Sequence, residues 1–522
     1  MSEGTTQQVK KFGKWRTFFW PVHSFELRKF LPMLFIFFLL SFDYNVLRCM
    51  KDTIVITAKD AGAEVIPFIK VWVMFPTSVL LTYVFIRLSN RFSRERVFQI
   101  MLSIFLGYFF LFAFFLYPAR ESLHANASAD ALKTLLPVGC RGLIAMYRYW
   151  IYTSFYVMAE LWSNIVLFLL FWGFANQVTR LDEAKRFYGL FGLGTNFSGI
   201  ASGQISIWIS QLAFNPNLPF GDDAWGQSMT WLILLVLLAG VATMLLFRWL
   251  NKNVLANECG TETTSKDASQ GKKKKFSMRE NLRYVCTSSY VLAIALIVIA
   301  YNLVINLVEV MWKHELCQLY PDPKDYNVYM NEITTIIGIL ATLTALFISG
   351  NSMRKFGWTF TAMLTPAVLL LTSIGFFGFF FLKDSPQIVQ HLFGMAPLSL
   401  VVFFGSMQNC FSRACKYTVF DATKEMAFVP LSAEAKIKSK AAVDGVCNRL
   451  GKSGGSVIYN VLLVLFTSIS ASAPYVAVFL AIAICLWIIS VRFLGKKFNE
   501  ISGSTGTIDE PNKPLKTAPA AA

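Results

Sequence analysis

The stretch LPMLFIFFLLSFDYNVLRCM, residues 31–50, decides how the rest of the chain is interpreted. It is mostly apolar, and it is long enough for an α-helix to cross the hydrocarbon core of a bilayer. It nevertheless contains Arg48 and leads directly into Lys51. Because a charge at the bilayer centre costs about 2.5 kcal/mol or more, charged residues inside spans are usually functional or paired. The stretch therefore predicts a membrane helix whose cations have a role inside the protein.

The composition of the whole chain indicates a membrane protein with many spans. Of its 522 residues 55% are hydrophobic and only 15% are charged, whereas the surface of a soluble domain this long would need many more charges. Lys and Arg outnumber Asp and Glu by 48 to 31. On a soluble protein this excess would suggest a nucleic-acid partner. Here it falls in loops between apolar runs, so we expect a lipid bilayer as partner and no nucleic acid.

Twelve apolar runs are each long enough to form a membrane-spanning helix. They lie near 31–50, 66–87, 97–117, 147–176, 187–210, 228–249, 285–312, 331–350, 358–382, 394–415, 441–467 and 473–494. The expected fold class is therefore an all-α polytopic membrane protein with twelve transmembrane helices. The region 136–176 is ambiguous, since it fits one long helix preceded by an interfacial segment.

A polar linker at 251–284 divides the chain into two sets of six spans. We predict an N-terminal six-helix bundle at 31–250 and a C-terminal six-helix bundle at 285–495. Segment 1–30 precedes the first bundle. The tail 496–522, which we expect to be disordered, follows the second. The basic loops, including KKKK at 272–275, all fall on one side of the membrane if there are twelve spans. The positive-inside rule then predicts that both termini are cytoplasmic.

The two predicted bundles are faintly alike in sequence. Tyr44-Asn45 in the first span matches Tyr301-Asn302 in the seventh, and the Glu-Ala-Lys of 183–185 matches that of 434–436. These pairs lie at similar offsets and in register with the spans. They suggest two pseudo-symmetric halves, a pattern found in transporters whose binding site lies between the halves near the bilayer midplane.

Polar residues recur at helical spacing on one face of several spans. Lysine and arginine bind phosphate oxygens well, and the small residues of GKSGG at 451–455 would let a ligand or a helix come close. A cavity lined in this way suits a polyanion. Glu160 and Glu309 could pair with the lysines when no polyanion is bound, bind a counter-cation or take a proton. The candidate substrate-binding residues are Arg48, Lys51, Glu160, Asn196, Asn306, Glu309, Arg449 and Lys452.

A second interpretation of these charges is that they form structural ion pairs that join helices. The histidines and cysteines show no metal-ligand spacing and no nucleophile constellation, so we expect no catalytic residues, no metal and no cofactor. A membrane-embedded transferase would need a catalytic cluster at an interfacial loop, which the sequence lacks. A sugar or peptide permease would not explain buried lysines contributed by both halves.

Five stretches resemble the nucleotide transport proteins, the ATP/ADP translocases of chlamydia- and rickettsia-like intracellular bacteria and of plastids. They are LRCMKDTIVITAKDAGAEVIPFIK at 47–70, AELWSNIVLFLLFWGFANQ at 159–177, EAKRFYGLFGLGTN at 183–196, NLVEVMWK at 306–313 and RLGKSGG at 449–455. The resemblance implies a major-facilitator-like fold and a bacterial cytoplasmic membrane location. It also implies that the charged residues Lys51, Glu160, Glu309 and Lys452 are functional. Asn196 would correspond to the family's asparagine of the fifth span.

The expected function is that of a secondary transporter, an antiporter that imports host ATP in exchange for ADP. The sequence does not decide whether inorganic phosphate is co-transported or which residues bind the adenine base. Lys51, Lys452, Arg48 and Arg449 would hold the phosphate chain, and we expect a monomer. The alternative within the same family is a proton-coupled symporter of GTP, UTP or other nucleoside triphosphates.

Overall fold

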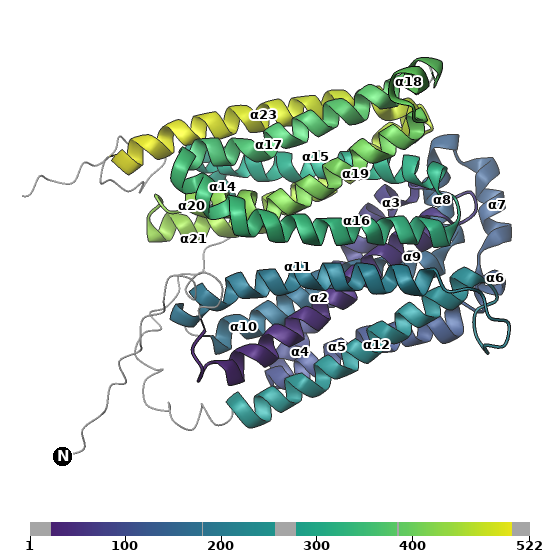
Figure 1. Cartoon of the computed structure of the whole chain (residues 1–522), viewed down its shortest axis with the longest axis horizontal. Helices are drawn as coiled ribbons and strands as arrows, with labels where there is room; N and C mark the ends of the chain where they lie inside the picture. Colours follow the sequence, from purple (N-terminus) through teal and green to yellow (C-terminus); the bar gives the residue numbers. More distant parts are fainter. Residues whose placement is uncertain (1–21, 180, 256–277, 384–385, 504–522) are drawn as a thin grey trace, which may run out of the picture.

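The computed structural model describes residues 22–179, 181–255, 278–383 and 386–503. Within these ranges it contains helices and no strand (Figure 1). The long helices run side by side along the longest axis of the molecule, and α2, the first of them, begins at the same end at which the last, α23, finishes. The chain is thus an all-helical bundle, as the sequence predicts.

The first half of the chain supplies the helices in the lower part of Figure 1 and also α3, α7 and α8 at its right-hand side. Its long helical stretches are α2 (Leu27–Ile56), α3–η1–α4 (Val65–Phe68, Ile69–Met74 and Phe75–Arg91), α5–η2 (Arg94–Leu111 and Phe112–Leu116), α9–η4–α10 (Trp150–Trp162, Ser163–Trp172 and Gly173–Val178), α11 (Leu181–Ser210) and α12–η5 (Ala224–Leu250 and Asn251–Leu255). Short helices between α5 and α9 are α6 (Arg120–Leu123), α7 (Asn126–Leu135), η3 (Val138–Cys140) and α8 (Arg141–Arg148).

The second half begins with α14 (Met278–Thr287) and supplies the upper helices of Figure 1. Its long helical stretches are α15 (Ser289–Leu319), α16–η6 (Pro323–Thr344 and Ala345–Ser349), α17 (Gly350–Leu382), α19–η7 (Pro397–Cys415 and Lys416–Phe420), α21–η8–α22 (Ala433–Ala442, Val443–Cys447 and Asn448–Phe466) and α23 (Ile469–Gly503). The shorter α18 (Pro386–Phe393) and α20 (Asp421–Ala427) complete it.

Nine helices in the described part of the chain are long and apolar enough to cross a membrane. The other three predicted spans coincide with the helices α11, α19 and α22, whose sequences carry more polar residues. Every predicted span therefore falls on a helix, while the count of twelve crossings stays a prediction. Most of the predicted linker and tail, including KKKK at 272–275, lies outside the described residues.

The two halves meet most closely where α11 crosses α16, and small residues make this crossing possible. A Cβ atom at Gly338 would lie 2.7 Å from the backbone oxygen of Asn196, and one at Gly203 would clash with Thr335. Gln204 also donates a hydrogen bond to Thr335, at 3.2 Å. Close backbone approach with hydrogen bonds across it is how helices associate where lipid removes the hydrophobic drive.

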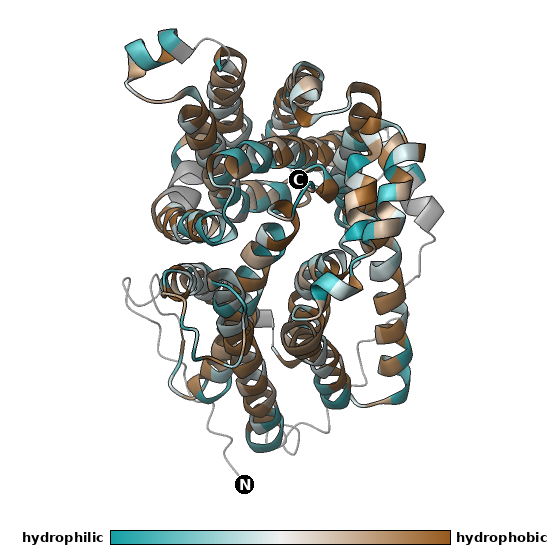
Figure 2. Cartoon of the chain, turned by 90° about the vertical axis from the view of Figure 1, so that its right-hand side faces the viewer, coloured by the Kyte–Doolittle hydropathy of each residue, from teal (hydrophilic) through white to brown (hydrophobic). Residues whose placement is uncertain are grey.

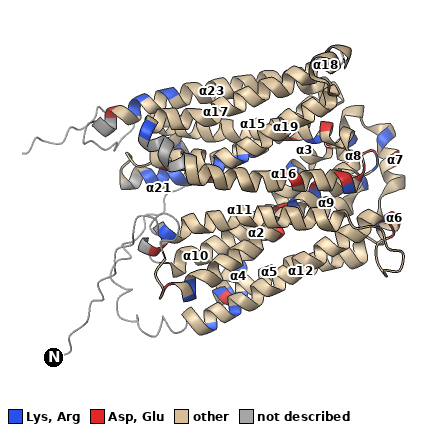
Figure 3. Cartoon of the chain, viewed as in Figure 1, with Lys and Arg blue, Asp and Glu red and all other residues tan. Residues whose placement is uncertain are grey.

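The two ends of the bundle differ in charge and covering. Many Lys and Arg residues lie near the end at which α2 begins, here called the basic end (Figure 3). At the opposite end, called the α6–α8 end, the segment 118–149 folds into short helices that cover the bundle, and hydrophilic residues gather there around apolar helices (Figure 2). The sequence predicts the long helix after residue 147 but not the short helices before it.

Candidate functional site

A buried ion-pair network begins on α2 of the first half. The Lys51 ammonium lies 2.9 Å from Asp52 and 3.3 Å from Glu160 of α9. It also lies 3.9 Å from the centroid of the Tyr156 ring, a cation–π contact. The Lys51 side chain is only 3% exposed. A buried charge is tolerated when it is paired and hydrogen-bonded, so these neighbours explain how α2 holds a lysine inside the protein.

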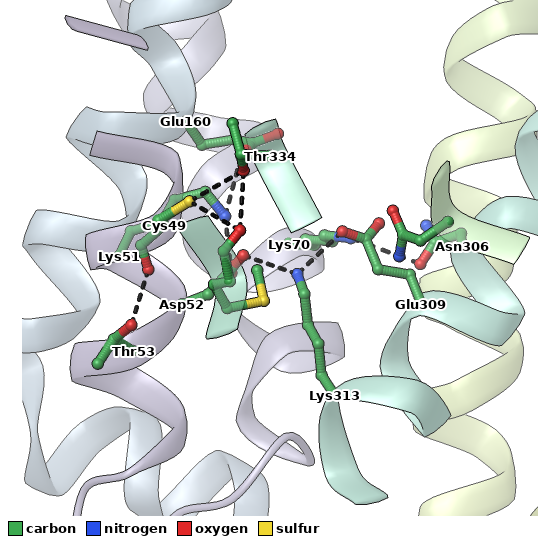
Figure 4. Close-up of polar contacts among 12 residues, drawn as sticks. Cys49, Lys51, Asp52, Thr53, Lys70, Glu160, Asn306, Glu309, Lys313 and Thr334 are labelled. Carbon is green, nitrogen blue, oxygen red and sulfur yellow. Dashed lines mark hydrogen bonds and ion pairs between the residues drawn. The ribbon is translucent and has the colours of Figure 1, made fainter. Parts of the chain in front are cut away.

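The network continues into the second half through Asp52. Its second carboxylate oxygen lies 2.8 Å from Lys313 of α15, and Lys313 lies 2.9 Å from Glu309, one turn earlier on the same helix. Glu309 in turn accepts a hydrogen bond of 3.1 Å from Arg413 of α19. Figure 4 shows Lys51, Asp52 and Lys313 converging from the two halves. Asp52–Lys313 is thus an ion pair that joins the two halves across their interface.

The network is balanced in charge. Among the described residues, its ion pairs link three cations, Lys51, Lys313 and Arg413, with three carboxylates, Asp52, Glu160 and Glu309. Each carboxylate therefore has a basic partner, and each cation an acidic one. This is the pairing that the sequence suggested for Glu160 and Glu309 in the absence of a polyanion.

Next to the network, Lys70 and the GKSGG segment meet through Asn306. Lys70 donates to Asn306 at 3.4 Å, and the Asn306 amide donates to the Lys452 backbone carbonyl at 2.5 Å. Gly451 and Gly455 make this packing possible, because a Cβ at Gly451 would lie 2.7 Å from Asn302, and one at Gly455 3.1 Å from Asn306. The glycines of α22 therefore let it lie directly against the polar face of α15.

The cations around the network exceed its carboxylates. Within the described part of the chain, Arg48, Lys70 and Lys452 form no ion pair with a carboxylate. The Lys452 side chain is exposed, although it interacts electrostatically with Glu160, Lys70 and Arg413. An exposed amine surrounded by helices of both halves is accessible to a solute. The surplus of positive charge suits an anion.

The structure brings together most of the residues that the sequence suggested. Lys51, Glu160 and Glu309 belong to the network, Asn306 and Lys452 adjoin it, and Arg48 lies within electrostatic range of Glu309. Two residues lie elsewhere. Asn196 lies at the α11–α16 crossing, and Arg449 is exposed, with no polar contact to the described residues.

Four charged residues of the site are missing from the candidate list, although Lys313 falls on the polar stripe of the seventh span: Asp52, Lys70, Lys313 and Arg413. Two signals were available. Asp52 follows Lys51 directly, and Lys313 is four residues from Glu309 on one helical face. Arg413 lies at the end of a predicted span, where a basic residue looks like a marker of topology.

Contacts between the halves continue along α2 on both sides of the network. Thr53 donates to Asn327 at 3.4 Å, and Cys49 contacts the Thr334 hydroxyl at 3.3 Å, both across the interface. At the basic end, Lys29 of α2 and Glu183 of α11 form an ion pair within the first half, at 3.0 Å. The Asp52–Lys313 pair, these hydrogen bonds and the α11–α16 crossing therefore join the halves through the middle of the bundle.

Known carriers resemble this chain over nearly its whole length. A family model described as TLC ATP/ADP transporter matches residues 5–498. ADP,ATP carrier protein 1 of Chlamydia pneumoniae is 43% identical over 496 residues, which cover 95% of this chain and 96% of that protein. ADP,ATP carrier protein 1, chloroplastic, of Arabidopsis thaliana is 40% identical over 475 residues, covering 91% of this chain and 74% of that protein.

A solved structure supports the fold. The inward open conformation of the xylose transporter XylE from E. coli superposes with a TM-score of 0.51 at 12% identity, covering 92% of this chain and 99% of that one. At this identity the likeness concerns the fold alone, and it supports the major-facilitator-like architecture that the sequence predicts. The resemblance seen in the sequence is confirmed by the family match: the chain belongs to the TLC ATP/ADP transporter family.

Proposed function

We propose that this protein is an antiporter that imports ATP in exchange for ADP by alternating access. The observation that carries the proposal is the ion-pair network across the two halves, with unpaired cations beside it. The names of the relatives, ADP,ATP carriers of a chlamydia and of a plastid, support ATP and ADP as the cargo.

In this proposal the phosphate chain binds between the halves on the basic side of the network. Lys452, Lys70 and Arg48 supply the first charges, because they carry no carboxylate partner in the described structure. Asn306 adds an amide beside them. The phosphates then draw Lys51 away from Glu160, since charge-assisted hydrogen bonds to phosphate are strong. Arg449 and Asn196 would reach the nucleotide only in another conformation.

Exchange follows from the cost of moving the site without cargo. Buried cations that lose their partners during reorientation cost several kcal/mol each, and every 1.4 kcal/mol or so slows a step tenfold. A bound nucleotide compensates these charges in transit. In the conformation described here, the carboxylates of the network neutralise these cations, so the penalty is absent. It arises only if the Asp52–Lys313 pair separates when the halves reorient, and the antiport therefore requires that separation.

The protein acts in this proposal as a secondary transporter and not as an enzyme. We place it as a monomer in the cytoplasmic membrane of a bacterium, with the basic end and both termini in the cytoplasm. The two six-helix bundles, 31–250 and 285–495, move relative to each other around the network.

The test is uptake of labelled ATP into cells that produce the protein. Lys452→Ala and Lys51→Ala should nearly abolish uptake while the protein stays in the membrane, because each removes a charge from the phosphate site. Lys436→Ala on α21, a half-buried lysine of the basic end, is the matched control and should transport normally. Near-normal uptake by Lys452→Ala would remove this residue from the site.

Proton-coupled uptake of other nucleoside triphosphates is a second candidate, and Asp43 of α2 favours it. Asp43 is fully buried, and neither of its carboxylate oxygens has a hydrogen-bond partner among the described residues. A carboxylate without a partner is costly in the interior, so this position disfavours the ionised form of Asp43. Preloading proteoliposomes with ADP and adding a protonophore separates the candidates: antiport needs internal ADP and ignores the protonophore.

A further inference from the structure

A second cavity, separate from the network, lies at the α6–α8 end and has a volume of about 660 Å³. It is lined by Ile54 of α2 and by Thr57, which caps that helix, by α6, α7 and α8, by the beginnings of α9 and α12, and by Pro323 of the second half. It therefore lies at the end of α2, beyond Asp52 and the network. Four carboxylates and four basic side chains line it: Asp60, Glu121, Asp130, Asp223, Lys59, Arg120, Lys133 and Arg148. Its volume is in the range of pockets that hold small molecules.

Two arginines of this cavity are held in place while their acidic partners are exposed. The side chains of Arg120 and Arg148 are 15% and 13% exposed, whereas those of their partners Asp222 and Asp130 are 79% and 64% exposed. Arg120 also donates to the Tyr117 carbonyl at 3.1 Å. Ion pairs with exposed carboxylates contribute little, about 0 to 1 kcal/mol. A phosphate group can therefore displace these carboxylates from guanidinium groups that are already oriented.

Beside the arginines lies a cluster of aromatic rings. Tyr149 and Tyr152 stack with their centroids 5.6 Å apart and their planes inclined by 12°, and both line the cavity. The His124 ring meets both edge-on, at 4.8 and 4.9 Å. Burial and the neighbouring Arg120 lower the pKa of His124, so the ring is neutral at pH 7. A flat, uncharged aromatic surface is a platform on which a nucleobase can stack.

We propose that this cavity is a second nucleotide site, which binds ATP at the α6–α8 end of the bundle. Arg120 and Arg148 hold the phosphates, and the base stacks on Tyr149 or Tyr152. This inference rests on the proposed function for the choice of ATP as ligand. The site would deliver ATP to the end of α2, where the helix leads from Thr57 back to Asp52 and Lys51 of the network.

The experiment measures equilibrium binding of radiolabelled ATP to the full chain in lipid nanodiscs. Wild type should bind two molecules, and Lys452→Ala, which impairs the central site, should still bind one. Adding Arg120→Gln and Arg148→Gln to Lys452→Ala should weaken the remaining binding at least about tenfold, the loss expected when charge-assisted hydrogen bonds to phosphate are removed. Arg141→Gln is the control, an exposed arginine of α8 that does not line the cavity.

The double variant with Lys452 intact tests folding, because it should keep the central binding. Two results overturn the proposal: an isotherm of Lys452→Ala that the two further substitutions leave unchanged, or a double variant that loses both classes of binding together. The proposed function fails separately, if wild-type proteoliposomes exchange no ATP for ADP. In that case the isotherms alone still decide whether the cavity binds ATP.

Discussion

Replacing Asp52 with asparagine tests whether the ion pair between the halves holds the described conformation. Asp52 is 1% exposed, and it lies 2.9 Å from Lys51 and 2.8 Å from Lys313. Asparagine keeps the size of the side chain but removes its charge. Lys51 then retains Glu160, and Lys313 retains Glu309, so each half keeps its own ion pair. The ion pair between Asp52 and Lys313, which joins the two halves, is lost.

The size of the effect follows from the burial of this pair. Removing one partner of a buried ion pair costs about 3 to 5 kcal/mol. If the pair forms only in the described conformation, the whole cost falls on that conformation. At about 1.4 kcal/mol per factor of ten, the lower value shifts the equilibrium away from the described conformation by roughly a hundredfold.

Cys49 is a reporter for this shift. Its thiol is buried and contacts the Thr334 hydroxyl across the interface, at 3.3 Å, so a reagent reaches it only when the halves separate there. In a variant in which Cys49 is the only cysteine left, a membrane-impermeant maleimide should label Asp52→Asn far faster than the parent protein. Glu160→Gln is the matched control, because it removes a carboxylate from Lys51 within one half.

An unchanged labelling rate in Asp52→Asn would refute the reasoning, since it would mean that the pair persists when the halves move or contributes nothing to their contact. Equal acceleration in Glu160→Gln would refute it as well. That result would assign the effect to the charge on Lys51 and not to the link between the halves.

Two further predictions concern the packing of the bundle. Gly338→Val should hold α16 away from α11, because a Cβ there would meet the Asn196 backbone oxygen and the Ile200 side chain within 3 Å; Cys49 labelling should accelerate, and an unaffected rate would contradict the close crossing. Trp162→Phe should lower the unfolding temperature in detergent, because it removes the 3.0 Å hydrogen bond that the indole donates to the Leu40 carbonyl, between α9 and α2, a loss of about 0.5 to 1.5 kcal/mol; an unchanged unfolding temperature would contradict it.

The sequence predicts the helices well because the bilayer imposes their length. Every predicted span coincides with a helix, although the ends differ: the first is predicted at 31–50, and α2 extends over Leu27–Ile56. Its last turns carry buried polar residues, Asp52 and Thr53 among them, and hydropathy alone ends a span where such residues begin. The short helices between α5 and α9 lack a long apolar period, so nothing in the local pattern announces how they fold.

The candidate site was predictable where a charge is out of place, and unpredictable where its partner comes from another helix. Glu160 and Glu309 are conspicuous inside apolar spans. Asp52 becomes part of the site only because Lys313 approaches it from the other half, and no spacing within one helix encodes that approach. Arg413 lies near the end of α19, where the positive-inside rule accounts for a basic residue without any partner.

The equal numbers of cations and carboxylates in the network have an electrical consequence. The membrane potential does about 2.3 kcal/mol of work per 100 mV on each elementary charge that crosses the field, but a neutral group of ion pairs moving as a unit carries no net charge through it. ATP bears one more phosphoryl group than ADP and is the more negative of the two. The membrane potential would then act on the difference in charge between ATP and ADP and on the cations that move with them. The direction of net ATP movement would therefore depend on the membrane potential.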